Sequence, residues 1–349
     1  MPGKFAAVIV ATCLLSSAPS WAQEAEDLEE LETVLVIGEQ PGPGLWKVSQ
    51  GDHVMWVLAS HGPLPKGMTW RSRQVEARIA ESQQVLYPGS ASIDYDVGFF
   101  RMLGLIPAAM KADDIPGGKT LKDVLPVETW EEWSALRERY LGHDSRVERS
   151  RPTFALRKLR AAAYSKHRLS DGPVVGEIVR DLAKKHKVKV RTLRDVKREI
   201  KVKGLDKLLK RVREIEVPDL ECFTTSLARV EADIEQLKVR ANAWARGNVE
   251  ELRSLHLQRA VGSECGGVLA DALIAADPEE AEKVRQLREE TRIKEQDARR
   301  QLAQEWVAAA QAALQKNRTA FAILPIRQVV SDNGYIAELR KLGYQVEEP

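Results

Sequence analysis

The sequence predicts an α/β fold in which strands from both ends of the chain form a mixed sheet around a large helical insertion. Two observations carry this prediction: strand-like apolar runs cluster before residue 96 and after residue 316, and the pattern of about 96–316 is mostly helical. Of the 349 residues, 44% are hydrophobic and 30% are charged, which is typical of a globular chain.

The N-terminal elements begin with a hairpin signal. Two strand-like runs, Leu45–Ser49 and His53–Ala59, flank the turn sequence Gln50-Gly51-Asp52. A helix is expected from Thr69 to about Ser82, and a short strand from Gln84 to Tyr87. This β-α-β order favours an α/β architecture.

The middle of the chain is expected to be helical with one strand, Lys187–Leu193. A further helix has a well-formed start, because Asp277 can cap it and Pro278 suits its first turn. It could run to Lys316, although the charged stretch Arg288–Arg300 offers little apolar face and could break it. The other expected helices are Glu128–Tyr140, Phe154–His167, Val174–His186 and Asp219–Ala245.

The chain returns to α/β form at its C-terminal end. Ala320–Leu324 is an apolar strand, and Ile336–Leu342 is a helix with Gly343 as its C-cap residue. Tyr344–Glu347 is the final strand. We expect the C-terminal strands to join the N-terminal ones in one sheet, which makes residues 45–349 a single domain.

Residues 1–22 are typical of a secretory signal peptide. Lys4 precedes the apolar run Phe5–Leu15, and Ser20-Trp21-Ala22 places small residues where a signal peptidase cuts, between Ala22 and Gln23. The run is too short to span a bilayer, so we expect an exported protein, periplasmic or secreted, with no transmembrane segment in the mature chain. The alternative is an uncleaved membrane anchor. Residues 23–44 form an acidic, flexible tether.

Cleavage of this leader would remove Cys13 and leave two cysteines, Cys222 and Cys265. In an exported protein an even pair is most simply a disulfide. The alternative is two buried thiols.

Several chemistries find no support in the motifs. Gly117-Gly118-Lys119-Thr120 ends like a phosphate-binding loop, but Asp113 stands where the leading glycine is required. The chain has no H-E-x-x-H, C-x-x-C or G-x-G-x-x-G motif, and its six histidines show no metal-ligand spacing. Trp56, Trp70, Trp244 and Trp306 are expected to be packing aromatics.

The near-zero net charge of +2 hides a strongly basic stretch. Residues Arg180 to Arg213 hold 15 Lys and Arg against four carboxylates, and Glu214 to Glu235 then hold seven carboxylates against Arg229 alone. One hypothesis is a patch for an anionic partner of the cell envelope, namely a membrane surface, a lipid head group or an acidic polysaccharide. The other is a basic and an acidic helix that face each other. Nucleic acid is not expected, because the basic stretch has no aromatic residue to stack on bases.

Four stretches together resemble the TraB/GumN family of bacterial exported proteins, which is related to the Tiki metalloproteases. They are Leu45-Trp46-Lys47-Val48, the segment His53–Ser72, Asn317-Arg318, and the end from Asn333-Gly334-Tyr335 through Gly343-Tyr344-Gln345-Val346. The resemblance implies an α/β fold whose two halves each bring a G-x-x-H motif to a shared cleft. It also implies that these histidines, a glutamate after the next strand and an arginine before the last strand hold a divalent metal, which activates water for attack on an amide.

The sequence departs from this pattern at each expected metal ligand. Val57-Leu58 is followed by Ala59-Ser60-His61-Gly62, so Gly62 occupies the ligand position and His61 comes one residue early. The expected glutamate falls near Pro88, and Gln328 replaces the second histidine. Only Arg318 matches a family site position outright.

The sequence therefore predicts an exported cell-envelope protein of the TraB/GumN type that binds or assembles without catalysis, a pseudoenzyme linked to exported polysaccharide, as one family namesake suggests. No cofactor is expected. The alternative is a metal-dependent peptidase or hydrolase of the Tiki/TraB type, in which His61 reaches the site and a divalent metal is required. The candidate cleft residues are Ser60, His61, Arg318 and Gln328. Lys66, within the turn Pro63–Gly67, and Arg71, just after it, could receive an anionic ligand if that turn borders the cleft.

Overall fold

A computed structural model describes residues 42–66, 70, 73–96, 113–170, 174–202, 204–216, 219–257, 265 and 267–349. The signal-peptide prediction with its cleavage point at Ala22 and Gln23, most of the tether and Arg71 lie outside the described residues.

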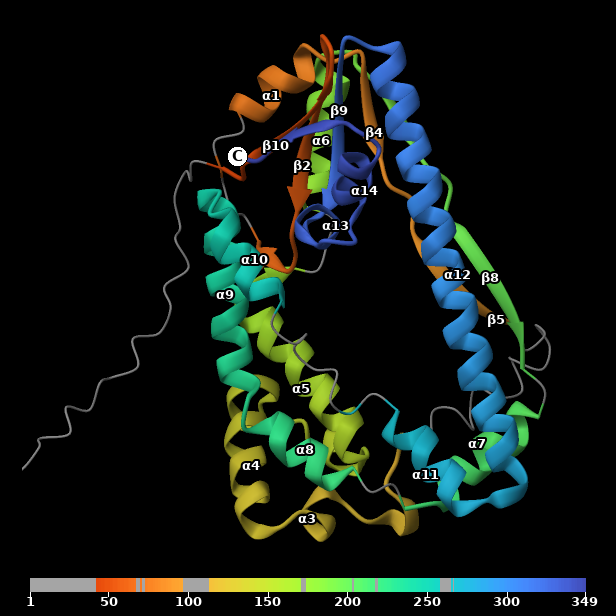
Figure 1. Cartoon of the computed structure of the whole chain (residues 1–349). Helices are drawn as coiled ribbons and strands as arrows, with labels where there is room; N and C mark the ends of the chain where they lie inside the picture. Colours follow the sequence, from red (N-terminus) through yellow and green to blue (C-terminus); the bar gives the residue numbers. More distant parts are fainter. Residues whose placement is uncertain are drawn as a thin grey trace, which may run out of the picture. The chain divides into compact units, whose positions relative to one another are not determined.

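Strands from both ends of the chain share one six-stranded mixed sheet, as predicted (Figure 1). Its order is β10-β1-β2-β9-β4-β7, and β2, β9, β4 and β7 run parallel to one another. The antiparallel hairpin of β1 and β2 turns at Gly51, whose φ of +61° suits glycine. One strand, β7, comes from within the predicted helical insertion. The strands are β1 (Leu45–Gln50), β2 (His53–Ser60), β4 (Gln84–Tyr87), β7 (Lys189–Thr192), β9 (Thr319–Pro325) and β10 (Gln345–Glu347).

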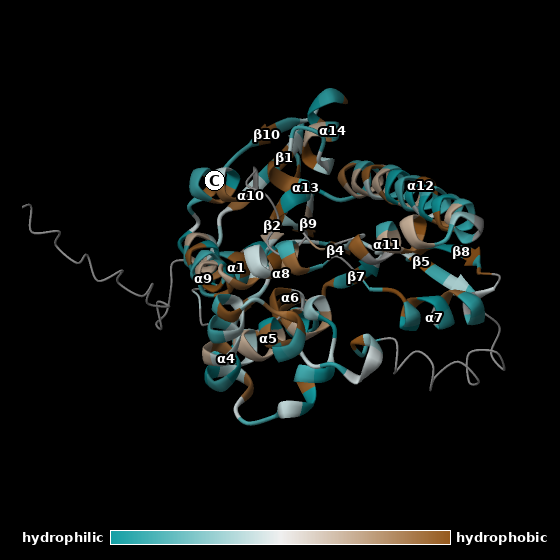
Figure 2. Cartoon of the chain, turned by 90° about the horizontal axis from the view of Figure 1, so that it is seen from below, coloured by the Kyte–Doolittle hydropathy of each residue, from teal (hydrophilic) through white to brown (hydrophobic). Residues whose placement is uncertain are grey.

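Both faces of the sheet are covered, which explains why its central strands are almost continuously apolar. Helices α1 (Arg73–Ala80) and α6 (Val174–Lys185) lie on one side of the sheet, and α12 (Pro278–Lys316) and α14 (Tyr335–Lys341) lie on the other (Figure 2). The Arg78 guanidinium of α1 stacks on Trp56, and the Arg180 guanidinium of α6 stacks on Tyr87. On the other face the strands contribute small residues, such as Ala320 and Ala322, to the core cluster that Trp306 of α12 and Tyr335 of α14 share.

A long parallel ribbon extends from the sheet and was not predicted. β4 continues into β5 (Ala91–Asp96), and β7 continues into β8 (Val196–Lys201), so the second pair of strands repeats the pairing of the first. The two connections are held together where Leu193 N donates to Tyr87 O and Ser90 N donates to Asp195 Oδ1. α12 runs along this ribbon, and Val196 packs against Ala298 and Leu302.

α12 is one continuous helix, so the charged stretch Arg288–Arg300 does not break it. Its start is the predicted one, because Asp277 Oδ1 accepts from Glu280 N at 3.2 Å. The charged stretch stays helical because its charges pair along the helix, as Arg292 does with Glu289 and Lys294 with Glu290.

Helices of the middle region build a second core around Trp133 and Phe223. The expected single helix Asp219–Ala245 is wrong, since it divides into α8 and α9 around Ala228 and Arg229. A physical reason is that the Ser226 carbonyl at the end of α8 accepts from Arg160 Nη2 on α5, at 3.4 Å. The elements of this region are η1 (Pro116–Gly118), α3 (Leu121–Val124), α4 (Val127–Leu141), η2 (Ser145–Arg149), α5 (Pro152–Lys166), α7 (Leu205–Glu214), α8 (Leu220–Leu227), α9 (Val230–Arg246), α10 (Val249–Leu257) and α11 (Val268–Ala276), and a small pair of strands, β3 (Leu64–Pro65) and β6 (Leu169–Ser170).

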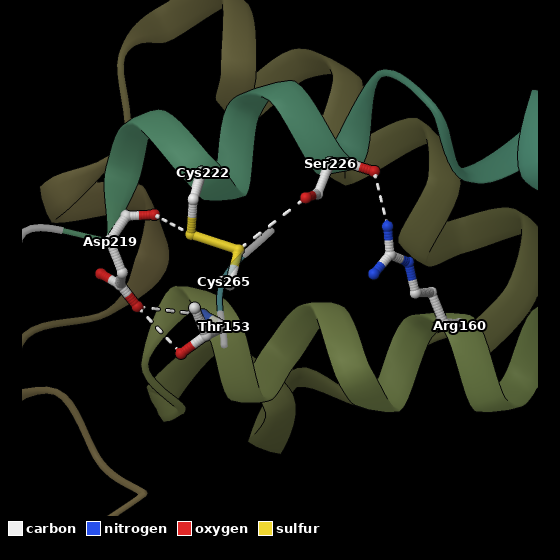
Figure 3. The surroundings of a disulfide bond; sticks show 6 residues. All are labelled: Thr153, Arg160, Asp219, Cys222, Ser226 and Cys265. Carbon is white, nitrogen blue, oxygen red and sulfur yellow. Dashed lines mark hydrogen bonds between the residues drawn. A yellow bond between two sulfur atoms is a disulfide. The ribbon is translucent and has the colours of Figure 1, made fainter. Parts of the chain in front are cut away.

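Cys222 and Cys265 form a disulfide across a sequence separation of 43 residues (Figure 3). Cys222 lies in the first turn of α8. The start of α8 is fixed to α5 because Asp219 Oδ2 accepts from Thr153 N and Thr153 Oγ1, at 3.1 and 3.0 Å. Among the described residues, no helix has both the length and the apolar composition needed to cross a membrane.

Candidate functional site

The candidate site lies at the carboxyl ends of three neighbouring parallel strands, β2, β9 and β4. Residues that follow such strands meet at one edge of the sheet, where ligands of α/β proteins commonly bind. Ser60 at the end of β2 is in register with Pro325 at the end of β9, and Ser60 Oγ donates to Leu324 O at 3.2 Å. His61 and Gly62 continue from β2, and Pro88 continues from β4.

The three positions that the family pattern assigns to metal ligands follow these three strands. Gly62 comes two residues after β2, Gln328 three residues after β9, and Pro88 directly after β4. Glycine and proline have no side-chain donor, and a glutamine amide is a weak ligand compared with imidazole or carboxylate. Within the residues that the structure describes, no three His, Cys, Asp or Glu side chains are grouped so as to hold a metal. The residues present at this edge do not fit a divalent metal.

Gln328 lies on a short helix, α13 (Ile326–Val330), that begins directly after β9. The chain then turns back closely, because Gly334 packs against the backbone of this helix. A Cβ added to Gly334 would lie 2.5 Å from Gln328 O and 3.0 Å from Ser331 O. The glycine therefore permits the tight approach that holds α13, and with it Gln328, at the end of β9.

Arg318 does not join the other candidate residues. It precedes β9, its carbonyl oxygen accepts from Val54 N at the start of β2, and its side chain is 77% exposed and lies 3.5 Å from Asp52. The seven residues of β9 separate it from Pro325, which at about 3.3 Å per residue is roughly 23 Å. The candidate residues Ser60, His61 and Gln328 thus share one edge of the sheet, and Arg318 belongs to the opposite edge.

Two buried tryptophans pack at the end of β2, namely Trp244 from α9 and Trp70 from the segment between β3 and α1. Trp244 on α9 is fully buried, and its indole Nε1 donates to Ala59 O at 2.7 Å. Trp70 meets Trp244 edge to face with ring centroids 5.7 Å apart. Both tryptophans are packing aromatics, as predicted. The hydrogen bond from Trp244 to Ala59, next to Ser60 and His61, has no signal in the sequence, because Trp244 and Ala59 are 185 positions apart.

Tyr87, at the end of β4, is a structural residue. Its hydroxyl donates to Gly176 O on α6 at 2.8 Å, and burial raises its pKa, an effect that nearby Arg180 opposes. The phenol therefore stays protonated at neutral pH. The turn that contains Lys66 packs on the helical region, where Lys66 N donates to Arg168 O and β3 pairs with β6.

The basic stretch Arg180 to Arg213 is distributed over four elements, so the hypothesis of one basic helix facing one acidic helix is wrong. It covers the end of α6, both strands β7 and β8, and α7. Four of its cations pair with carboxylates of other elements or turns: Lys185 with Glu76, Lys197 with Asp94, Arg198 with Asp297, and Arg211 with Asp277.

Comparison with known proteins gives one match. The model of the TraB/PrgY/gumN family covers residues 44–348, which is the span of the sheet and of the whole helical region. No curated protein and no solved structure matches significantly. Since the matched segment includes both halves of the sheet and the three strand ends described above, the chain belongs to the TraB/PrgY/gumN family.

Proposed function

We propose that this protein is an exported cell-envelope member of its family that binds or assembles other components without metal-dependent catalysis. The observation that supports the proposal is the composition of one sheet edge. Gly62, Pro88 and Gln328 follow three adjacent parallel strands, where the family pattern expects two histidines and a glutamate. The three positions follow neighbouring strands, and none of the residues there has the imidazole or carboxylate that the family pattern expects.

Export is supported by residues 1–22 and by the disulfide. Disulfides form and persist in oxidising compartments such as the periplasm or the extracellular space. We expect a mature chain that begins at Gln23. The intact mass of the protein purified from its native cell envelope checks this: a mass that includes residues 1–22 would contradict cleavage.

The family resemblance suggests a more specific role for the protein, in the assembly of exported polysaccharide. In that role the carboxyl edge would hold a ligand through hydrogen bonds. The edge offers a hydroxyl at Ser60, an imidazole at His61 and an amide at Gln328, which are donors and acceptors suited to a hydroxyl-rich ligand.

Metal content tests the proposal directly. Elemental analysis of protein purified without chelator should find zinc, manganese and cobalt far below one per chain. The triple variant Gly62→His, Pro88→Glu, Gln328→His should gain close to one Zn²⁺ per chain, because it restores three donors at neighbouring strand ends. Gly62 has room for a side chain, since an added Cβ would meet nothing within 4 Å.

The matched control is the triple variant Gly62→Ala, Pro88→Ala, Gln328→Ala, which changes the same positions and adds no donor. Stoichiometric metal in the wild-type protein would refute the proposal. Metal uptake by the control as well as the restored variant would show that the sheet edge is not where the metal binds.

The second candidate function is a metal-dependent peptidase or hydrolase. One observation favours it: His61 directly follows Ser60, so one imidazole belongs to a residue at the carboxyl end of β2. In that case the wild-type protein should hold one metal per chain, and His61→Ala should lose it.

A further inference from the structure

The outer edge of the sheet carries a row of cations that the carboxyl-end site does not use. Six exposed cations make up this surface, which we call the basic edge. They belong to the last turns of α6, to β7 and to the turns beside β7, and they are Arg180, Lys184, Lys187, Lys189, Arg191 and Arg194.

These cations are not neutralised by the residues that the structure describes. In the part of the chain that the structure describes, none of the six takes part in an ion pair, in contrast to Lys185, Lys197, Arg198 and Arg211. Only two carboxylates, Asp181 and Asp195, occur between residues 180 and 195. Asp195 accepts hydrogen bonds from Ser90 N and Ser90 Oγ, both at 2.8 Å, so it is held by the turn after β4. Like charges thus accumulate on a strip of surface that wraps around β7. Lys189 and Arg191 are in register with Gln84 and Leu86 and share the sheet face of Ala320 and Ala322, whereas Arg180 stacks on Tyr87 on the α6 face.

The strip follows an open strand. β7 is last in the strand order, pairs with β4 among the described residues, and all four of its residues are exposed. Its outer edge therefore presents backbone N–H and C=O groups beside the cations. Lys189 and Arg191 project from the same face of the strand, about 6.6 Å apart.

Charged residues on an edge strand also protect the strand from aggregation. The cations of β7 itself are enough for that protection. Arg180 and Lys184 lie on α6 rather than on the strand, and the Arg180 guanidinium is stacked 4.5 Å from the centre of the Tyr87 ring. These helix cations border β7 from the face of the sheet opposite to Lys189 and Arg191, and protection of the strand does not require them.

The types of side chain in and around the row indicate which class of anionic partner it suits. A membrane-surface site combines cations with apolar side chains that enter the lipid, and a nucleic-acid site adds aromatic side chains that stack on bases. Among the described residues between 180 and 194, Val190 is the one exposed large hydrophobic residue, and the segment contains no Phe, Tyr or Trp. A linear row of cations beside free backbone groups suits a linear polyanion that also carries many hydroxyl groups.

We propose that the basic edge binds an acidic polysaccharide along β7 and the end of α6. The proposal does not depend on the function proposed above for the carboxyl-end site, and it concerns a different set of residues.

The test uses the purified protein and a polyuronate, with neutral dextran as the uncharged polymer. The protein should bind the polyuronate at low ionic strength, should lose it in high salt because the charges are exposed to screening, and should not bind dextran. The variant Lys189→Gln, Arg191→Gln, Arg194→Gln should bind at least about tenfold more weakly, since clustered charge of one sign concentrates a counter-charged ligand.

A matched control comes from the same basic stretch. Lys207→Gln, Lys210→Gln, Arg213→Gln removes three exposed charges of α7 that form no ion pair among the described residues. This variant changes the net charge as much as the β7 variant does but leaves the basic edge intact, so polyuronate binding should stay within about twofold of wild type. The pair Lys184→Gln, Lys187→Gln lies outside β7 and should also weaken binding, which separates the charge effect from any damage to the strand.

Three results would overturn the proposal: no polyuronate binding at low salt, equal weakening by both triple variants, or binding to anionic phospholipid vesicles without binding to polyuronate. The last outcome would assign the basic edge to a membrane surface.

Discussion

Three residues that follow β2, β4 and β9 bear on the chemistry available at the carboxyl ends of these strands. Gly62 and Pro88 offer no donor, and Gln328 offers an amide on a helix that Gly334 holds tightly against the strand end. The function that we propose, binding without metal-dependent catalysis, rests on these three residues.

Glu76 gives a residue-scale prediction on pH dependence. Its carboxylate on α1 accepts from Lys185 Nζ at 2.6 Å and lies 2.8 Å from His186 Nε2, so it joins α1 to the end of α6. The hydrogen bond from Lys185 and then that from His186 lower the pKa of Glu76 below its usual 4.5. A lowered carboxyl pKa contributes stability that is present above pH 4.5 and is lost as the pH falls through the folded-state value.

Glu76→Gln should therefore lower the melting temperature slightly at pH 7, and the difference from wild type should shrink as the pH falls below 4.5. Thermal unfolding between pH 3 and pH 7 measures this. Glu81→Gln, which removes the exposed pair with Arg78 on the same helix, is the control and should have almost no effect. A Glu76→Gln difference that grows toward acid pH would contradict the assignment.

At the scale of elements, the parallel ribbon of β4–β5 and β7–β8 depends on a close backbone approach. A Cβ added to Gly89 would lie 2.3 Å from Arg194 O and 2.9 Å from Arg194 C. Both neighbours are backbone atoms, so they cannot move aside as a flexible side chain would. The glycine lets the two connections bend together between the sheet and the extension that α12 covers.

Gly89→Ala should destabilise the protein by about 1–3 kcal/mol, the usual cost of overpacking. Denaturant unfolding measures it. The control is Gly62→Ala, where an added Cβ meets nothing within 4 Å, and its free energy of unfolding should stay within about 0.5 kcal/mol of wild type. Equal effects of the two substitutions would show that the approach at Gly89 is not tight.

At the scale of the whole molecule, the disulfide constrains the helical region. Cys222 and Cys265 close a loop over a sequence separation of 43, and the chain-entropy model assigns such a loop about 4 kcal/mol of stability. Cys222→Ala, Cys265→Ala should lower the free energy of unfolding by roughly that amount, as should reductant on the wild-type protein. Reductant should leave the double variant unchanged, and a loss below about 1 kcal/mol would show that the bond adds little constraint.

The helical region and the sheet act as one structure near the site. Trp244, from α9, hydrogen-bonds the end of β2, and Gly42 N, just before β1, donates to Ala245 O. The insertion therefore fixes the strand end that carries Ser60 and His61.

The sequence by itself determined most of the sheet and its long helices. The hairpin at Gly51, the strand Gln84–Tyr87, the apolar strand after Arg318 and the helix start at Asp277 all follow from local periodicity and turn chemistry, which neighbouring residues are enough to establish. The substitution of ligand types at Gly62, Pro88 and Gln328 was also evident, because it compares residue types with a family pattern.

Only the tertiary structure decided features that join distant residues. Strand β8 packs against α12, about 100 positions away, and buries only Val196 and Ile200, so its mixed polar pattern gave no strand signal. The expected helix Asp219–Ala245 divides where Arg160, on α5, donates to the Ser226 carbonyl. The separation of Arg318 from Ser60 and Gln328 depends on the direction of β9, and the basic edge appears only once β7 is the outermost strand. Each is set by long-range packing and pairing, which local sequence does not encode.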